Sequence, residues 1–320
     1  GGGGGAGGLA RMTVLVADVG GTNTRLALGS GGRLTADTLV RLRNDDHASF
    51  DAALDSYLAG RPAPAAMCIA IAGPVTDGAA GATGRLTNRD WGFDSAALTA
   101  RTGARVRLIN DLTALGFALG GLAGDGLVPV WTPPADAVRG INGQALVLGL
   151  GTGVNVCAVK AGPQGALCLE AEAGHTALPA PVAAALAARL GSADAFPTVE
   201  ALFAGRGLAR LHAGLTGAAL PGDRIVAEAA TDAAAAATLT LFAAMLGTYA
   251  RDLALMFMPR AGLYLAGSVA RGVVGAAADA FRGAFTADAP FAAIPRGIPV
   301  RIIADDMAAL TGCLAALGDG

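Results

Sequence analysis

The stretch VLVADVGGTNTRLAL (residues 14–28) has a counterpart further along the chain, LVLGLGTGVNVCAV (residues 146–159). Each stretch consists of two apolar segments separated by a glycine-rich turn that contains a threonine. This pattern predicts a β-hairpin in both places. Backbone N–H groups in such a turn can close on phosphate oxygens. An ordinary tight turn is the alternative for either hairpin alone, and the occurrence of two hairpins favours phosphate binding.

The elements expected after each hairpin follow in the same order, strands first and crossover helices later. After the first hairpin we expect strands at 34–42, 67–73 and 105–111 and a helix at 49–59. After the second we expect a strand at 166–172, a mostly helical region at 181–258, strands at 262–267 and 299–303, and helices at 271–285 and 305–317. The repeated order predicts an α/β protein with two halves.

Length and composition exclude several classes of protein. The 320 residues (31.3 kDa) suggest two domains. The net charge of −2 and pI of about 5.9 give no basic excess of the kind that nucleic-acid binding requires. The four cysteines (Cys68, Cys157, Cys168, Cys313) form no CxxC pair, so we expect buried, reduced side chains in a cytoplasmic protein.

Two further segments bear on location. Residues 233–250 carry no charge over 18 positions, and we interpret them as a buried core helix rather than a membrane span, so no membrane partner is expected. The opening GGGGGAGGLA has neither a basic nor an apolar region of a signal peptide. We expect residues 1–11 to be a disordered glycine-rich leader, with Met12 as the natural start.

Other phosphate-binding schemes do not fit. A Walker A loop needs GxxxxGK[ST], and Lys160, the only lysine, stands in VCAVKAG without that context. The three histidines lie in no HRD motif, which excludes a protein kinase. A dinucleotide fingerprint needs a helix directly after the glycines, whereas the β-rich VNVCAV follows GLGTG. A hairpin with Asp18 at the end of its first strand remains, and this carboxylate can hold Mg²⁺ directly or through water.

Seven motifs, taken together, resemble those of a known family. ADVGGTNTRLAL, IAIAGPV, LTNRDW, LINDLTALG, LGLGTG, EAEAGH and YLAGSVARG occur in this order. The set resembles the bacterial glucokinases of the hexokinase–actin–chaperone ATPase superfamily, from Met12 to the C-terminus. The zinc-binding cysteines of the related repressor–kinase branch and an N-terminal DNA-binding helix pair are absent from the sequence.

The resemblance implies a two-domain α/β fold, the ribonuclease-H-like fold of actin-like ATPases and hexokinases, with a deep inter-domain cleft. It implies a small domain at 12–116 plus 305–320 and a large domain at 117–304. The implied activity is transfer of the ATP γ-phosphoryl group to the 6-hydroxyl of D-glucose, with Mg²⁺, in the cytoplasm. A homodimer is left open.

The resemblance also implies roles for individual residues. Asp111 corresponds to the general base, although its position alone favours a helix N-cap before LTALGFAL. The implied sugar-binding residues are Asn110, Asp111, Glu172, His175 and Glu200, with Asn88 a weaker candidate. The implied nucleotide-binding residues are Ala17, Asp18, Val19, Gly20, Gly21, Thr22, Gly151, Thr152, Gly153, Gly267 and Ser268, with Mg²⁺ at Asp18, either directly or through water.

Two departures from the family pattern leave alternatives open. EAEAGH has Ala171 and Ala173 where the family commonly has glycines, which bears on the choice of hexose. DDMAALTG (residues 305–312) replaces an Asn-Pro-Gly type of turn, which bears on how the last helix docks. The alternatives are a kinase for fructose, mannose or an amino sugar, a non-catalytic nucleotide-dependent sugar sensor, and a phosphoryl donor such as ADP or polyphosphate.

Overall fold

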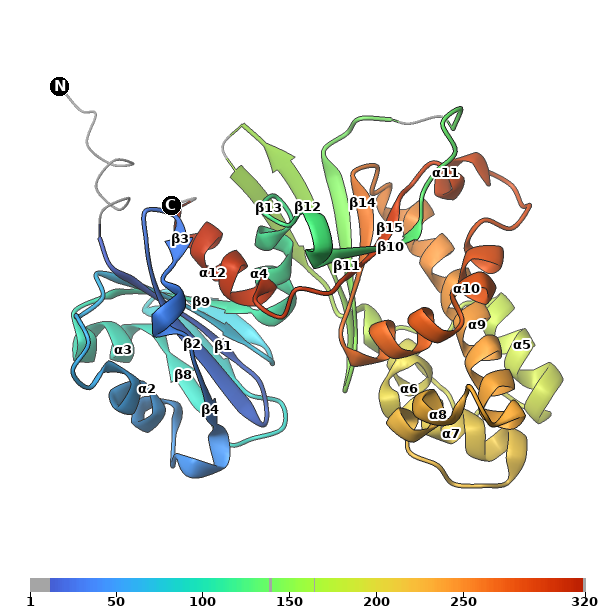
Figure 1. Ribbon diagram of the computed structural model, residues 1–320, viewed down its shortest axis with the longest axis horizontal. Helices are drawn as coiled ribbons and strands as arrows, with labels where there is room; N and C mark the ends of the chain where they lie inside the picture. Colours follow the sequence, from blue (N-terminus) through green and yellow to red (C-terminus); the bar gives the residue numbers. More distant parts are fainter. Residues whose placement is uncertain (1–11, 138–139, 164, 319–320) are drawn as a thin grey trace. The chain divides into compact units, whose positions relative to one another are not determined.

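The computed structural model describes residues 12–137, 140–163 and 165–318 (Figure 1). The predicted leader at 1–11 lies outside these residues. The chain forms two compact units. Among the described residues, unit 1 comprises 12–122, 165–166 and 306–318, and unit 2 comprises the rest, within Ala123–Pro163 and Leu167–Asp305. The expected domain limits at 116/117 and 304/305 stay a prediction.

The main sheet of unit 1 has six strands in the order β3-β2-β1-β5-β9, with β4 also pairing with β2. β1 is antiparallel to β2 and parallel to β5, and β5 is parallel to β9. The strands are β1 (Val14–Val19), β2 (Asn23–Ser30), β3 (Arg33–Leu34), β4 (Val40–Arg43), β5 (Ala66–Ile71) and β9 (Arg105–Asn110). Because β1, β5 and β9 are parallel, their carboxyl ends lie at one edge, where Asp18 and Asn110 are found.

Continuous apolar segments explain this sheet, since every residue of β5 (AMCIAI) is buried. One hydrophobic core of unit 1 joins β1, β2 and β5 to side chains of α2 and α3. The helices of unit 1 are α2 (Phe50–Leu58), α3 (Ser95–Thr102), α4 (Asp111–Ala118) and α12 (Ala308–Gly318). α12 packs against α4, β5 and β1, so the last helix docks on unit 1 despite the unusual DDMAALTG turn.

Unit 2 repeats the same strand plan. Its six-stranded sheet has the order β10-β15-β14-β11-β12-β13. β11 is antiparallel to β12 and parallel to β14, and β14 is parallel to β15. The strands are β10 (Leu127–Trp131), β11 (Gln144–Leu150), β12 (Val154–Gly162), β13 (Gly165–Glu170), β14 (Gly262–Ala266) and β15 (Val300–Ile303). The two predicted hairpins are therefore β1–β2 and β11–β12.

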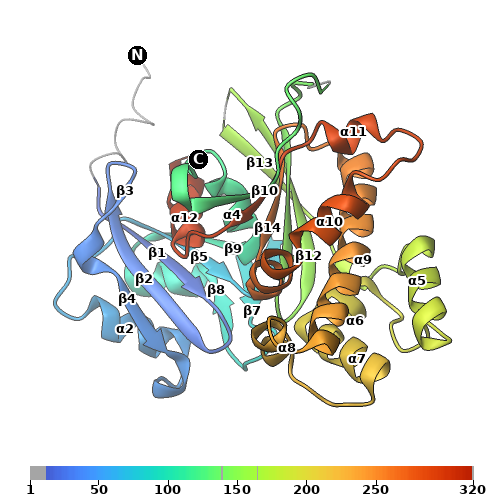
Figure 2. The ribbon, with the colours of Figure 1, turned by 45° about the vertical axis from the view of Figure 1, so that its right-hand side comes forward.

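A long helix, α9 (Ala233–Phe257), lies in the core of unit 2 and packs against α10, α7 and α8 (Figure 2). It is long and apolar enough to cross a membrane, yet Leu239, Phe242, Leu246 and Leu253 are buried in the protein core. The interpretation of this segment as a core helix is confirmed. The other helices are α5 (Ala180–Leu190), α6 (Val199–Phe203), α7 (Gly205–Thr216), α8 (Gly222–Glu228), α10 (Ala278–Phe285) and α11 (Ala293–Arg296).

Several elements differ from expectation. The strand predicted at 34–42 is interrupted by a 3₁₀ turn, η1 (Ala36–Thr38), and the helix predicted at 271–285 is divided into a π-helical segment, η5 (Ala270–Val274), and α10. A small sheet of β6 (Val75–Gly78), β7 (Gly81–Arg85) and β8 (Gly92–Asp94) was not expected. Cys68, Cys157 and Cys313 are buried as predicted, whereas Cys168 is only partly buried.

Candidate active site

The first glycine turn, residues 20–22, joins β1 to β2. The Gly20 N–H donates to the Asn23 carbonyl at 3.0 Å, which closes the hairpin. Asn44, in η2 (Asn44–Asp46), holds the turn from outside: its Nδ2 donates to the Gly20 carbonyl at 2.7 Å, and its N–H donates to the Thr22 carbonyl at 2.9 Å. The Asn44 side chain is itself fixed, because its Oδ1 accepts from Thr24 Oγ1 at 2.8 Å in the buried interior.

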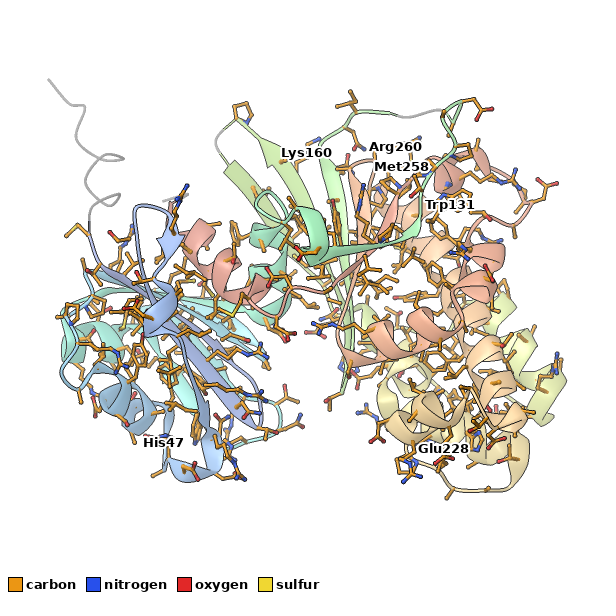
Figure 3. All side chains as sticks on the ribbon, in the orientation of Figure 1. His47, Trp131, Lys160, Glu228, Met258 and Arg260 are labelled. Carbon is orange, nitrogen blue, oxygen red and sulfur yellow. The ribbon has the colours of Figure 1, made fainter. Side chains whose placement is uncertain are left out.

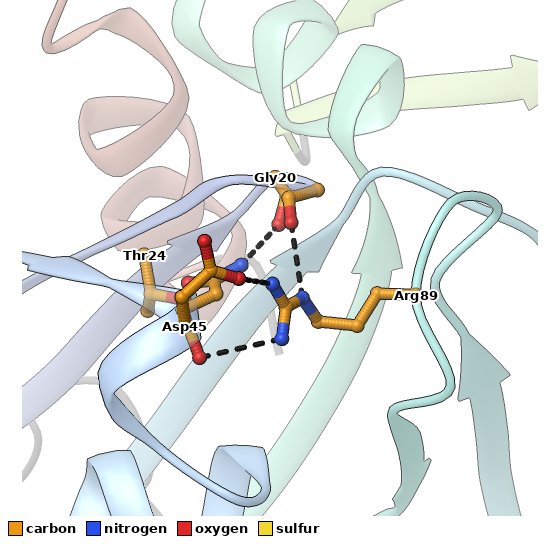
Figure 4. A network of polar contacts seen from close by, with 6 residues as sticks. Gly20, Thr24, Asp45 and Arg89 are labelled. Atoms are coloured by element: carbon orange, nitrogen blue, oxygen red, sulfur yellow. Dashed lines mark hydrogen bonds and ion pairs between the residues drawn. The ribbon is translucent and has the colours of Figure 1, made fainter.

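Arg89 holds the same turn from a second direction (Figure 4). Its Nε donates to the Gly21 carbonyl at 3.2 Å, and its Nη1 lies 3.4 Å from the Asn44 carbonyl. The guanidinium also forms an ion pair with Asp45 and lies over the Trp91 ring, 5.3 Å from the centroid. The turn is therefore braced by two side chains that are distant from it in sequence.

Asp18 stands near the end of β1, opposite Arg25 of β2. Arg25 Nη1 lies 3.3 Å from Asp18 Oδ2 and 3.0 Å from the Asp306 carbonyl. Burial raises the pKa of Asp18, and the charge of Arg25 opposes that rise. The carboxylate fits a Mg²⁺ ion held mostly by phosphates and water, which is how Mg²⁺ commonly binds nucleotides. No group of three or more metal-ligating side chains occurs in the described part of the chain.

Asp111 is the first residue of α4, directly after β9, and it is not the N-cap. The cap is Asn110, whose Oδ1 accepts from the Leu112 N–H at 2.9 Å and whose Nδ2 donates to the Gly73 carbonyl at 3.0 Å. The Asp111 carboxylate also accepts from the Leu112 N–H, at 2.9 Å, and from the Asn110 side chain. Asn110 therefore performs the capping role that position alone suggested for Asp111.

The electrostatic surroundings of Asp111 are those of a proton acceptor. Burial is the main cause that raises its pKa to about 6, and the negative charge of Asp18 adds to the rise. The two carboxylates influence one another because β1 and β9 both end at the same edge of the sheet, with β5 between them. A carboxyl group with a pKa closer to neutrality is a stronger base than an ordinary aspartate.

The second glycine turn, residues 151–153, joins β11 to β12 in unit 2. The Gly151 N–H donates to the Gly153 carbonyl at 3.0 Å, a bond that spans two residues where the bond of the first turn spans three. Glu200 of α6 packs beside it, and its Oε2 accepts from the Val154 N–H at 3.1 Å. Arg206 pairs with Glu200 Oε1 and donates through Nη1 to the Thr152 carbonyl at 3.2 Å.

The predicted sugar segment lies beside the same hairpin. Asn155 of β12 donates from Nδ2 to Glu172 Oε2 at 3.2 Å and accepts from the Ala173 N–H at 3.0 Å. Glu172 and His175 are both exposed at the two ends of the 3₁₀ turn η4 (Ala173–His175). Ala171 and Ala173 pack against the hydrophobic core of unit 2.

The remaining predicted residues lie at strand ends. Gly267 follows β14 with φ 95°, and an added Cβ would overlap the Leu150 carbonyl oxygen, so only glycine fits there. Ser268 begins the helical segment after it. Lys160, labelled in Figure 3, donates to the Asn142 carbonyl at the far end of the β11–β12 hairpin from the glycine turn.

The structure thus gathers the predicted residues into two groups. Ala17 to Thr22, Asn110 and Asp111 lie at one sheet edge of unit 1, with Asn88 beside Gly21. The group in unit 2 gathers around the second glycine turn and consists of residues 151–153, Glu172, His175 and Glu200.

Sequence reasoning missed five polar side chains that contact these groups: Arg25, Asn44, Arg89, Asn155 and Arg206. Arg25, Arg89 and Asn155 lay inside motifs quoted above, ADVGGTNTRLAL, LTNRDW and LVLGLGTGVNVCAV, without any signal of their role.

Comparison with known proteins gives consistent results. A family model described as Glucokinase matches residues 15–319. A glucokinase of Brucella suis biovar 1 (strain 1330) is 32% identical over 95% of this chain and 91% of its own length. The crystal structure of a glucokinase from an Antarctic psychrotroph has a TM-score of 0.80 at 26% identity, with 96% of this chain and 99% of that one covered.

A third similar protein is a ROK family glucokinase from Streptomyces griseus, whose structure contains glucose and AMPPNP. It has a TM-score of 0.59 at 19% identity and covers 95% of this chain and 98% of its own. At that identity the likeness concerns the fold, which is the actin-like ATPase fold expected from the sequence.

Proposed function

The chain belongs to the glucokinase family, and on that premise we propose that it transfers the γ-phosphoryl group of ATP to the 6-hydroxyl of D-glucose. The products are glucose 6-phosphate and ADP. Within the site, the proposal depends on one observation about Asp111. The pKa of this carboxyl group is raised to about 6, and the residue lies at the same edge of the sheet as a glycine turn and Asp18.

We propose that Asp111 is the general base. The sugar O6 forms a bond to the γ-phosphorus, the bond from that phosphorus to the β–γ bridging oxygen breaks, and the O6 proton goes to the Asp111 carboxylate. With a pKa of about 6 this carboxylate is ionised at neutral pH yet more basic than an ordinary aspartate. Asn110 hydrogen-bonds the Asp111 side chain and keeps it in place at the start of α4.

We propose that the two glycine turns bind the phosphates, and that Gly267 and Ser268 lie against the adenosine. Mg²⁺ neutralises charge on the transferring phosphoryl group when it is bound. Asp18 is the side chain that would hold it, directly or through water, and its carboxylate also lies close enough to Asp111 to raise that pKa. Positioning and charge neutralisation are the main protein contributions to this class of reaction.

We propose Asn110, Asp111, Glu172, His175 and Glu200 as sugar-binding residues. The exposed Glu172 and His175 supply an acceptor and a ring that can donate or accept, as recognition of several hydroxyls requires. Ala171 and Ala173 pack against the hydrophobic core of unit 2 and both stay partly exposed. Glucose is the expected acceptor, and another hexose is the alternative.

The test is release of ADP from Mg-ATP across a panel of hexoses, with a no-sugar control and the Asp111→Asn variant. We expect turnover with glucose and a loss of kcat by roughly 10²–10⁴ in the variant, the usual contribution of a general base. The wild-type kcat/KM should fall as the pH drops below about 6, because Asp111 becomes protonated.

Glucose binding to Asp111→Asn, followed by calorimetry, is the control for folding. Near-normal turnover in this variant would remove Asp111 as the base. Turnover confined to another sugar would replace glucose as the acceptor, and turnover with ADP or polyphosphate alone would replace the donor.

We further propose a cytoplasmic location and leave a homodimer as the candidate assembly. Buried Cys68 and Cys313 agree with a reducing compartment. Size-exclusion chromatography with light scattering measures the assembly directly.

A further inference from the structure

The two glycine turns share a feature that their sequences do not reveal. In the first turn, the carbonyl of Gly20 accepts from Asn44 Nδ2 and the carbonyl of Gly21 accepts from Arg89 Nε. Among residues 12–137, neither the Gly21 N–H nor the Thr22 N–H donates a hydrogen bond. Each of these N–H groups shares a peptide plane with one of the two held carbonyls: the Gly21 N–H with the Gly20 carbonyl, and the Thr22 N–H with the Gly21 carbonyl.

The second turn repeats this arrangement with different partners. The carbonyl of Gly151 accepts from the Gly205 N–H at 3.0 Å, and the carbonyl of Thr152 accepts from Arg206 Nη1 at 3.2 Å. Within the described parts of unit 2, the N–H groups of Thr152 and Gly153 donate no hydrogen bond. Both residues are exposed.

Peptide geometry connects the two observations. In a planar trans peptide the carbonyl of one residue and the N–H of the next point in opposite directions. A donor that holds the Gly21 carbonyl therefore aims the Thr22 N–H away from itself, and a donor on the Thr152 carbonyl does the same for the Gly153 N–H. Successive N–H groups aimed to one side form an anion-binding concavity.

Each arginine is fixed by a carboxylate. Arg89 pairs with Asp45, and Arg206 pairs with Glu200. The planar guanidinium can bond a carboxylate and a carbonyl at once with different N–H groups, which a lysine ammonium does with less directional control. The side chains of Arg89 and Arg206 are 24% and 54% exposed, so Arg89 is the more tightly enclosed.

We infer that Arg89 and Arg206 are positioning residues that hold the two turns in the orientation that binds the phosphates of ATP. This inference rests on the proposed function. Arg89 acts on the nucleotide alone, because its partners are Gly21, Asn44, Asp45 and Trp91. Arg206 acts on both substrates, because it also holds Glu200, a proposed sugar ligand.

The experiment compares Arg89→Ala, Arg89→Lys, Arg206→Ala and Arg206→Lys with wild type. Calorimetry with Mg-AMPPNP gives the dissociation constant for nucleotide, and steady-state kinetics give KM for ATP and for glucose. Arg85→Ala and Arg224→Ala are matched controls, because each removes an exposed arginine that pairs with a carboxylate, Asp90 or Glu228, in the same unit as its test residue.

We expect Arg89→Ala to weaken nucleotide binding by about 10- to 100-fold, the scale of a misplaced binding group, with an unchanged KM for glucose. Arg206→Ala should raise both KM values. The lysine variants should recover part of the nucleotide affinity, and the two controls should behave as wild type. A melting curve for each variant separates loss of folding from loss of binding, and the lysine variants serve if an alanine variant unfolds.

Two outcomes would overturn the inference: nucleotide affinity in Arg89→Ala and Arg206→Ala equal to that of their controls, or equal weakening of ATP and glucose in Arg89→Ala. Wild-type protein that fails to bind Mg-AMPPNP would instead count against the proposed function, so the two failures are distinguishable.

Discussion

Asp111 is the residue at which stability and the proposed activity oppose one another. Burial and the charge of Asp18 raise its pKa from an ordinary 3.8 to about 6. The folded protein therefore holds this proton more tightly than the unfolded chain does. The stability associated with the group is fully present below pH 4 and is lost as the pH rises towards 6.

This linkage predicts that Asp111→Asn is more stable than wild type at neutral pH. The pKa difference corresponds to about 3 kcal/mol, and we expect a gain of about 1–3 kcal/mol in the free energy of unfolding at pH 7.5. Urea denaturation at pH 7.5 and pH 4 measures it, and the gain should shrink at the lower pH because the wild-type carboxyl is then protonated. A variant less stable than wild type at pH 7.5 would show that the ionised Asp111 carboxylate does not destabilise the folded protein.

At the scale of elements, the pairing of α4 with α12 positions Asp111. α12 carries Gly312, and a Cβ added there would overlap the Ala114 carbonyl oxygen of α4. We therefore expect Gly312→Ala to destabilise the protein by about 1–3 kcal/mol, since overpacking forces neighbouring backbone to shift. It should also lower kcat, because α4 begins at Asp111.

The matched control is Gly283→Ala in α10, where an added Cβ meets nothing within 4 Å. That change should stabilise by about 0.5–1 kcal/mol, the usual advantage of alanine over glycine inside a helix. Thermal unfolding of both variants makes the comparison. If Gly312→Ala and Gly283→Ala changed the stability equally, α4 and α12 would be free to move apart.

The elements that sequence predicted well are those with a continuous apolar pattern. β5, β11 and β14 have their own hydrophobic segments, and α9 has an unbroken apolar face, so local pattern identified them. The small sheet of β6, β7 and β8 was missed because VTDG and GATGR have few apolar residues and owe their pairing to each other.

The residues of the candidate site also divide into those that local sequence predicted and those that it did not. The glycine turns and Asp111 were found through motifs that local sequence carries. Arg89 was not, because its partner Gly21 lies 68 residues away, and Asn44 holds a carbonyl 24 residues away. A contact of that kind is fixed by tertiary folding, and a single arginine in a loop carries no pattern that predicts it.

At the scale of the whole molecule, each unit has a hydrophobic core of its own. Domains with separate cores generally unfold separately. We therefore expect two calorimetric transitions, with Gly312→Ala shifting only that of unit 1 and Gly283→Ala only that of unit 2. A single transition that both variants shift alike would mean that the two units unfold cooperatively.

The discontinuity of unit 1 has a consequence for biosynthesis. Its sheet is made of residues translated before unit 2, yet α12, which packs on β1 and β5, is translated after unit 2. Domains ordinarily fold in the order in which they leave the ribosome. Here we expect unit 2 to mature while unit 1 still waits for α12, so a nascent chain carries Asp111 and both glycine turns before α12, which completes unit 1, exists. Premature termination before residue 308 should then yield an inactive protein, however complete its catalytic residues are.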